Sequence, residues 1–318
     1  MILKAIDTAT ALFQKAALLL IAFFCMVCAP QGQQPVTTAA KSPNQLAKVR
    51  VNGVVLHYLE RGSGVPVILV HGGLDDYRMW EAQVEPFSQH YHVIVYSRRY
   101  NYPNDNSDIR PDHSPIVEAD DLAALIKQLN LKAVHIIGHS YGALTALFLA
   151  VRHPELVRTL VLAEPPAFSL AQDTPAGLAL FNEFMENMSK PTADAFRRGE
   201  KEQALRLTIR YFLGDGAFEK ASEAQRQYWI DNLREWQATT TSQDPFPMLR
   251  REDVKKISAP VLSLSGTRTM PILAFVDSVL QPLWQHQERV ILQNATHDMW
   301  GEQPDVCRRV TLAFLARH

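Results

Sequence analysis

The feature that most constrains this chain is a five-residue corner, Gly138-His139-Ser140-Tyr141-Gly142, set between two apolar patterns. The run 133–137 before it has the length of a buried strand, and the run 143–151 after it is long enough for a helix. A turn this sharp strains its apex residue, and side chains at the two flanking positions would collide with the strand and the helix. The sequence therefore predicts a strand, a tight turn and a helix, with the Ser140 hydroxyl projecting above a sheet.

Length and composition favour one large folded domain with an inserted subdomain. The chain has 318 residues, 47% of them hydrophobic, and a formal net charge of −1. It lacks the basic excess of nucleic-acid-binding proteins, so we expect no nucleic-acid partner. The eleven histidines show no HExxH or paired-cysteine spacing, and no glycine-rich phosphate loop precedes a helix. We therefore expect neither a metal nor a nucleotide, and no cofactor at all.

The N-terminal segment differs from the rest of the chain. A continuous apolar run over residues 16–29 is short for a membrane span but has the size of a signal-peptide core. We expect export, with residues 1–29 as a signal peptide or a retained membrane anchor; lipid attachment at Cys28 is a third alternative. Residues 30–48 have the composition of a polar linker. Two of the three cysteines lie in the apolar run, which leaves Cys307 without a disulfide partner.

From residue 49 onward, strand patterns come first and then alternate with helix patterns. Residues 49–59 alternate around Asn52-Gly53 as a hairpin, and Ser114-Pro115 provides a cap and a first-turn proline for a helix ending near Asn130. Apolar runs predict further strands at residues 65–70, 91–96, 159–163, 260–265 and 289–292. This order predicts a mostly parallel sheet with helices on both faces.

Between about residues 166 and 251 the strand–helix alternation is lost, and helical patterns occupy residues 178–188, 202–213 and 222–236. We interpret this segment as a helical cap that follows a strand and covers the end of the sheet bearing Ser140. Its aromatic residues could line a substrate site, but aromatic residues at helical spacing usually pack the helices together, and we expect packing for most of them. They are Phe181, Phe184, Tyr211, Phe212, Tyr228, Trp229 and Trp236.

Together these features resemble the α/β-hydrolase family. The resemblance rests on the corner around Ser140, the His71-Gly72-Gly73 turn after a strand, the late His297 and the position of the cap, and it covers roughly residues 49–318. It implies a mostly parallel, eight-stranded sheet with helices on both faces and an inserted helical cap. Carried over residue by residue, Ser140 matches the nucleophile at a nucleophile elbow and His297 matches the catalytic base.

The resemblance also implies how these groups act together. A serine hydroxyl is a poor nucleophile until an imidazole takes its proton, and the same imidazole can then protonate the leaving group. The family stabilises the oxyanion with two backbone amides, here those of Tyr141 and Gly73; Leu74 replaces Gly73 if the turn is displaced by one residue. His71 and His139 match positions that support loops, so we expect no proton transfer through them.

The third catalytic residue, the acid that orients the histidine, does not follow the common pattern of the family. Most relatives carry an aspartate about three residues past a glycine after the strand at 260–265, but here Gly266 is followed by Thr-Arg-Thr-Met. Glu164 ends the neighbouring strand, and we predict that it orients His297 and stabilises the imidazolium. Asp277 is the alternative, although as a helix residue we expect it on a solvated face.

The type of nucleophile limits the classes of reaction that this chain could catalyse. Epoxide hydrolases and dehalogenases of this family use an aspartate at the elbow, which Ser140 cannot replace. The resemblance therefore implies a carboxylesterase-like serine hydrolase that cleaves a small, apolar ester through a Ser140 acyl-enzyme. Amide, lactone or carbon–carbon bond hydrolysis would use the same residues, and a receptor-like member without catalysis is a further alternative. In the loop 97–104 we expect the arginines to have a structural role.

Overall fold

The computed structural model describes residues 45–318. The predicted signal peptide or anchor (1–29) and most of the predicted linker (30–48) lie outside these residues. The first strand begins at Ala47, two residues before the start predicted for the folded domain. No helix within residues 45–318 has the length and apolarity needed to cross a bilayer.

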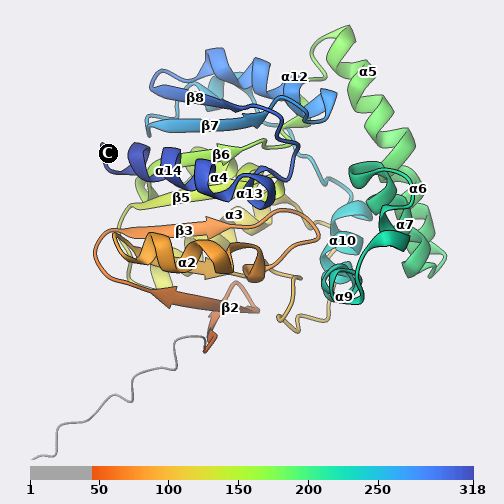
Figure 1. Cartoon of the computed structure of the whole chain (residues 1–318), viewed down its shortest axis with the longest axis horizontal. Helices are drawn as coiled ribbons and strands as arrows, with labels where there is room; N and C mark the ends of the chain where they lie inside the picture. The colour runs from red at the N-terminus through yellow and green to blue at the C-terminus, as the bar shows by residue number, and fades with distance from the viewer. Residues whose placement is uncertain (1–44) are drawn as a thin grey trace, which may run out of the picture. The chain divides into compact units, whose positions relative to one another are not determined.

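An eight-stranded sheet forms the centre of the fold (Figure 1). Its strands lie in the order β1-β2-β4-β3-β5-β6-β7-β8. The β1–β2 and β2–β4 pairs are antiparallel, and the other five pairs are parallel. The strands are β1 (Ala47–Val51), β2 (Val54–Arg61), β3 (Pro66–Val70), β4 (His92–Tyr96), β5 (Val134–His139), β6 (Val157–Ala163), β7 (Val261–Gly266) and β8 (Gln287–Leu292). The predicted eight-stranded, mostly parallel sheet is confirmed.

Helices cover both faces of the sheet, and the strands accordingly bury both sets of side chains. In β3, Val67 and Leu69 pack into one hydrophobic cluster, whereas Ile68 and Val70 pack into the other. Successive side chains of a strand point to opposite faces, so this apolar run belongs inside a parallel sheet. Residues of α2 (Glu81–Ser88) and α14 (Pro304–Leu315) join the first cluster; those of α3 (Pro115–Gln128), α4 (Tyr141–Arg152) and α12 (Pro271–Leu280) join the second.

Local sequence signals fix the ends of these elements. Asn52 and Gly53, with φ of 44° and 82°, form the tight turn between β1 and β2. The Ser114 side chain accepts a hydrogen bond from the Val117 amide, and Pro115 occupies the first turn of α3. The predicted hairpin and helix start are therefore observed.

The chain leaves the sheet after β6 and forms the helical cap. Its helices are α5 (Pro175–Phe184), the π-helical turn η4 (Met185–Ser189), α6 (Lys190–Arg197), α7 (Lys201–Leu213), α8 (Ala217–Lys220), α9 (Glu223–Asp231) and α10 (Leu233–Thr240). They gather at one end of the sheet, beyond the carboxyl ends of the parallel strands (Figure 1). The helix predicted over residues 222–236 is two helices. The break falls at Asn232, whose side chain donates to Asp76 Oδ2 at 2.7 Å and accepts from the Tyr102 amide at 3.0 Å. Both partners lie outside the cap.

The aromatic residues of the cap pack together, as the sequence predicted. Phe184, Trp229 and Trp236 are buried, and Phe181, Tyr211, Phe212 and Tyr228 are partly buried against the same hydrophobic cluster. Trp236 also donates its Nε1 hydrogen to Thr208 Oγ1 at 2.7 Å. This packing joins the cap helices to the hydrophobic cluster on that face of the sheet.

Candidate active site

Ser140 stands between β5 and α4 at the corner that the sequence singled out. Its φ of 52° and ψ of −123° are unfavourable for a residue with a side chain. A Cβ atom on Gly138 would lie 2.6 Å from Ala143 Cα, and one on Gly142 would lie 2.4 Å from the carbonyl oxygens of Val70 and His71. Only glycine fits at either position, so the expected steric reason for the motif is observed.

Glu164 and His297 meet at the carboxyl ends of the strands. Glu164 Oε2 lies 2.6 Å from His297 Nδ1. The carboxylate is buried, and it also accepts hydrogen bonds from the Gly266 amide at 2.8 Å and the Thr269 hydroxyl at 2.6 Å. Because a carboxylate accepts, Nδ1 carries the imidazole hydrogen and Nε2 keeps a lone pair. The arrangement therefore prepares Nε2 to take a proton.

Asp277 does not reach His297. It lies in α12, where its carboxylate accepts a hydrogen bond from Ser263 Oγ at 2.8 Å and pairs with Arg289. The expectation of a solvated face was wrong, since Asp277 is only 4% exposed. Its side of α12 faces β7, whose serine hydroxyls and the arginine of β8 satisfy the buried charge.

His139 connects the corner with the loop that carries His297. The centroids of the two imidazole rings are 4.7 Å apart, and His139 Nε2 donates to the His297 carbonyl oxygen at 2.9 Å. Within residues 45–318, Ser140 Oγ forms no hydrogen bond with His297. Such bonds are often long without substrate and shorten in the reacting complex. Burial lowers the pKa of His139 to about 3, so this ring stays neutral and supports the loop.

The turn after β3 presents a backbone amide beside the corner. The Leu74 amide donates to Glu235 Oε2 at 2.9 Å, which rules out the alternative that it faces a substrate. In the described part of the chain, the amides of Gly73 and Tyr141 donate to no other group. A Cβ on Gly73 would lie 2.7 Å from the Trp236 ring, so the cap lies directly over this turn.

His71 and Arg98 hold the same turn in place. His71 Nδ1 donates to the Gly72 carbonyl at 2.9 Å, and its Nε2 accepts from the Arg98 amide at 3.0 Å. Burial, followed by the charge of Arg98, holds the pKa of His71 well below its usual range. The Arg98 guanidinium donates to the same Gly72 carbonyl and pairs with Glu118 and, in the cap, with Glu235. The expected structural role of this arginine is observed.

Asp75 is a residue of this site that the sequence analysis missed. It lies in the turn after β3, and Tyr228 of the cap donates a hydrogen bond to its Oδ1 at 3.3 Å. Burial, together with the negative charges of Asp298 and Asp76, raises the pKa of Asp75 to about 7. The available signal was a pair of aspartates that follows the His-Gly-Gly turn after one leucine.

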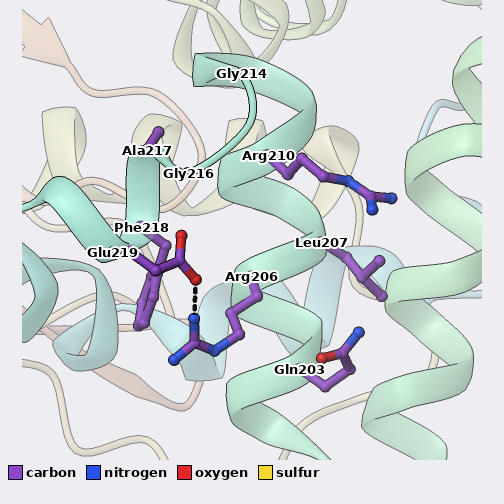
Figure 2. A pocket seen from close by; sticks show the side chains of 9 residues that line it. All are labelled: Gln203, Arg206, Leu207, Arg210, Gly214, Gly216, Ala217, Phe218 and Glu219. Atoms are coloured by element: carbon purple, nitrogen blue, oxygen red, sulfur yellow. Dashed lines mark hydrogen bonds and ion pairs between the residues drawn. The ribbon is translucent and has the colours of Figure 1, made fainter.

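A separate pocket lies on the surface of the cap, between α7 and α8 (Figure 2). Its lining residues are Gln203, Arg206, Leu207, Arg210, Gly214, Gly216, Ala217, Phe218 and Glu219. Arg206 pairs with Glu219 across it. Neither Ser140 nor His297 contributes to this pocket, so it is no part of the candidate active site. Within residues 45–318, no three His, Cys, Asp or Glu side chains form a metal-binding group.

Comparison with known proteins agrees with this architecture. The family model described as alpha/beta hydrolase fold matches residues 65–303. The chain belongs to this family. It is 23% identical to the (E)-2-((N-methylformamido)methylene)succinate hydrolase of Acinetobacter baylyi, over 83% of this chain and 95% of that protein. It is also 23% identical to a soluble epoxide hydrolase of Corynebacterium sp. strain C12, over 84% and 95% of the two chains. A thermophilic esterase from Thermogutta terrifontis superposes with a TM-score of 0.69 at 22% identity, over 86% and 98% of the chains.

Proposed function

We propose that this α/β hydrolase is a serine hydrolase that cleaves a carboxylic ester of a small, apolar substrate. The observation that carries the proposal is the 2.6 Å hydrogen bond between Glu164 and His297, beside a serine in the strained conformation of an elbow. Each group alone has ordinary structural explanations. Their convergence at one end of the sheet is the arrangement that acyl transfer needs.

In the proposed first step, His297 Nε2 takes the Ser140 proton while Oγ attacks the ester carbonyl. The imidazolium that forms is stabilised by the buried Glu164 carboxylate. His297 then gives the proton to the departing alcohol, and the acyl group stays on Ser140. Water repeats the sequence with His297 as base, which releases the acid and restores the serine.

The oxyanion of each tetrahedral intermediate needs donors that are already in place. We propose the amides of Gly73 and Tyr141 for this role, because neither has another acceptor in the described part of the chain. The Tyr141 amide is at the first turn of α4, where the helix leaves it unpaired and the helix dipole favours a negative charge. Donors of this kind are each worth about 10²- to 10³-fold in turnover.

The nucleophile separates this proposal from the chemistry of some relatives. The epoxide hydrolase named above opens an epoxide, whereas a serine at the elbow favours acyl transfer. The Trp236 ring of the cap lies over Gly73, which supports an apolar acyl or alcohol group beside the proposed oxyanion donors. Hydrolysis of an amide, a lactone or a carbon–carbon bond would use the same residues, and substrate assays distinguish these reactions.

Labelling with a fluorophosphonate probe tests the proposal directly. Purified wild-type protein should react at Ser140, and Ser140→Ala should abolish both labelling and hydrolysis of a series of 4-nitrophenyl esters of increasing chain length. Unchanged labelling of the alanine variant would place the nucleophile elsewhere. A wild-type protein that binds ligands but does not react with the probe would indicate the receptor-like alternative.

A further inference from the structure

The turn after β3 carries a carboxyl group that the proposed serine chemistry does not use. Asp75 is partly exposed, like Gly73, Ser140 and His297 around it. Its backbone carbonyl accepts from Asn101 Nδ2 at 2.7 Å, and its Oδ1 accepts from the Tyr228 hydroxyl at 3.3 Å. No donor within residues 45–318 reaches Oδ2. Oδ1 is thus held by a hydrogen bond, whereas Oδ2 has no donor among the described residues.

Two unpaired acceptors converge beside the nucleophile. A Cβ atom built on Gly72 would lie 3.0 Å from His139 Nδ1, 3.1 Å from Asp75 Oδ2 and 3.3 Å from Ser140 Cβ. His139 is 5% exposed and gives its Nε2 hydrogen to His297, so Nδ1 of the neutral ring holds a lone pair with no partner. Buried acceptors in proteins normally have a donor. A hydrogen-bond donor is therefore missing at His139 Nδ1, and Asp75 Oδ2 lies beside the same point.

The surrounding charges favour a positively charged donor. The two arginines around this turn are each bound by two carboxylates. Each arginine with its two carboxylates therefore carries a net negative charge. They are Arg98 with Glu118 and Glu235, and Arg78 with Asp76 and Asp231. Asp75 adds to this negative field, so a cation is attracted to the site and an anion is repelled.

We propose that Asp75 determines substrate specificity by binding an ammonium group that the substrate carries near its scissile ester bond. This inference rests on the proposed ester hydrolysis at Ser140. A protonated amine offers several N–H donors, which can serve Asp75 Oδ2 and His139 Nδ1 together. The favoured substrates are esters in which one short group, acyl or alcohol, bears the amine and the group on the other side of the ester bond is apolar.

The ionisation of Asp75 is consistent with this role. The groups that face it are Asp76, Arg98, His139, Tyr228 and Asp298, and burial with the two carboxylates raises its pKa to about 7. Without ligand, the carboxyl is partly protonated at neutral pH, and its own hydrogen can take the place of the missing donor. A bound ammonium favours the carboxylate, so binding releases that proton.

Two pairs of esters of matched shape test the proposal at pH 8. The first pair is 4-nitrobenzyl 3-aminopropanoate and 4-nitrobenzyl butanoate; the second is 4-(aminomethyl)benzyl butanoate and 4-ethylbenzyl butanoate. Hydrolysis is followed by chromatography of the released alcohol. We expect kcat/KM for the amine ester to exceed that for its neutral partner by about 10- to 100-fold in at least one pair. Asp75→Asn should abolish this ratio, because it keeps the shape and removes the charge.

Asp298→Asn is the matched control. It removes the same charge nearby, and asparagine can still accept the hydrogen bond that Asp298 receives from Gly301. The ratio should stay within about threefold of wild type if Asp75 makes the contact. Equal rates for both members of each pair, or equal losses in the two variants, would overturn the inference. If Asp75→Asn does not fold, Asp75→Ser gives the same comparison.

The same experiment distinguishes a failure of this inference from a failure of the proposed serine hydrolase function. Hydrolysis of the neutral esters with no preference for the amine esters would refute the role of Asp75 and leave the serine hydrolase intact. No hydrolysis of any of the four esters, together with no fluorophosphonate labelling, would refute both.

Discussion

Replacing Glu164 by glutamine tests the central hydrogen bond of the proposed site. The glutamine oxygen can still accept from the Gly266 amide, as Glu164 Oε1 does at 2.8 Å. Its amide nitrogen, however, would face His297 Nδ1 in place of Oε2 at 2.6 Å. An amide donates there, which moves the imidazole hydrogen to Nε2 and removes the lone pair that accepts the Ser140 proton.

The expected loss has two parts, the wrong imidazole tautomer and the missing negative charge beside the imidazolium. In serine hydrolases that lose the acid in this way, turnover falls by about 10⁴-fold. We expect kcat of Glu164→Gln to fall by about 10³- to 10⁴-fold, or about 4 to 5 kcal/mol in activation free energy, with little change in KM. Steady-state hydrolysis of a 4-nitrophenyl ester measures this loss.

Asp277→Asn provides the comparison. Asp277 is the alternative acid that the sequence offered, but it binds Ser263 and Arg289. Because Arg289 is 39% exposed, we expect a loss of about 1 kcal/mol in unfolding free energy and an unchanged kcat. A Glu164→Gln variant that keeps kcat within tenfold of wild type, or an Asp277→Asn variant that loses it, would refute the assignment of the acid.

The remaining predictions concern stability and export. Gly142→Ala should cost about 3 kcal/mol or more, measured by urea unfolding, because its Cβ would lie 2.4 Å from two carbonyl oxygens; a smaller cost would mean that the corner relaxes. Burial lowers the pKa of His113 to about 3, so wild-type stability falls as pH drops from about 6.5 towards 3. His113→Phe should reduce that slope by about 1 kcal/mol per pH unit, and an unchanged slope would contradict the burial argument. Glu235→Gln should lower the unfolding free energy by about 3 kcal/mol, since it leaves Arg98 with one buried partner; an unchanged Tm would refute this. The apolar run 16–29 predicts export, which fractionation and N-terminal sequencing of the mature protein check.

Local sequence signals were sufficient for the corner and for the alternation of strands and helices, whereas the family resemblance supplied the strand order and the Glu164–His297 contact. The corner needs glycine at Gly138 and Gly142 for steric reasons that act within a few residues. Glu164 could be found because parallel neighbouring strands bring their carboxyl ends to one edge, so a carboxylate at the end of β6 lies close to the loop after β8. The prediction of Glu164 therefore depends on the strand order that the resemblance implied.

Contacts between the cap and the sheet could not be found in this way. Glu235 binds the Leu74 amide across 161 residues, and Tyr228 binds Asp75 across 153. No periodic pattern in the sequence indicates either contact, because both depend on how the cap helices pack against the sheet. Asp277 was misplaced for the same reason, because helical spacing does not show which side of α12 faces the sheet. Burial of that side made the carboxylate an internal ion-pair partner.

The buried pair of Arg98 and Glu235 limits how substrate can enter. Arg98 also supports the Gly72 carbonyl, so α10 and the turn that offers the Gly73 amide are bonded to the same guanidinium. Separating the pair would leave Glu235 without its cationic partner at a cost of about 3 kcal/mol, so an opening by this route would be populated at below about 1%. Helix α10 therefore stays in place beside the site. The motions that admit substrate must involve other parts of the cap.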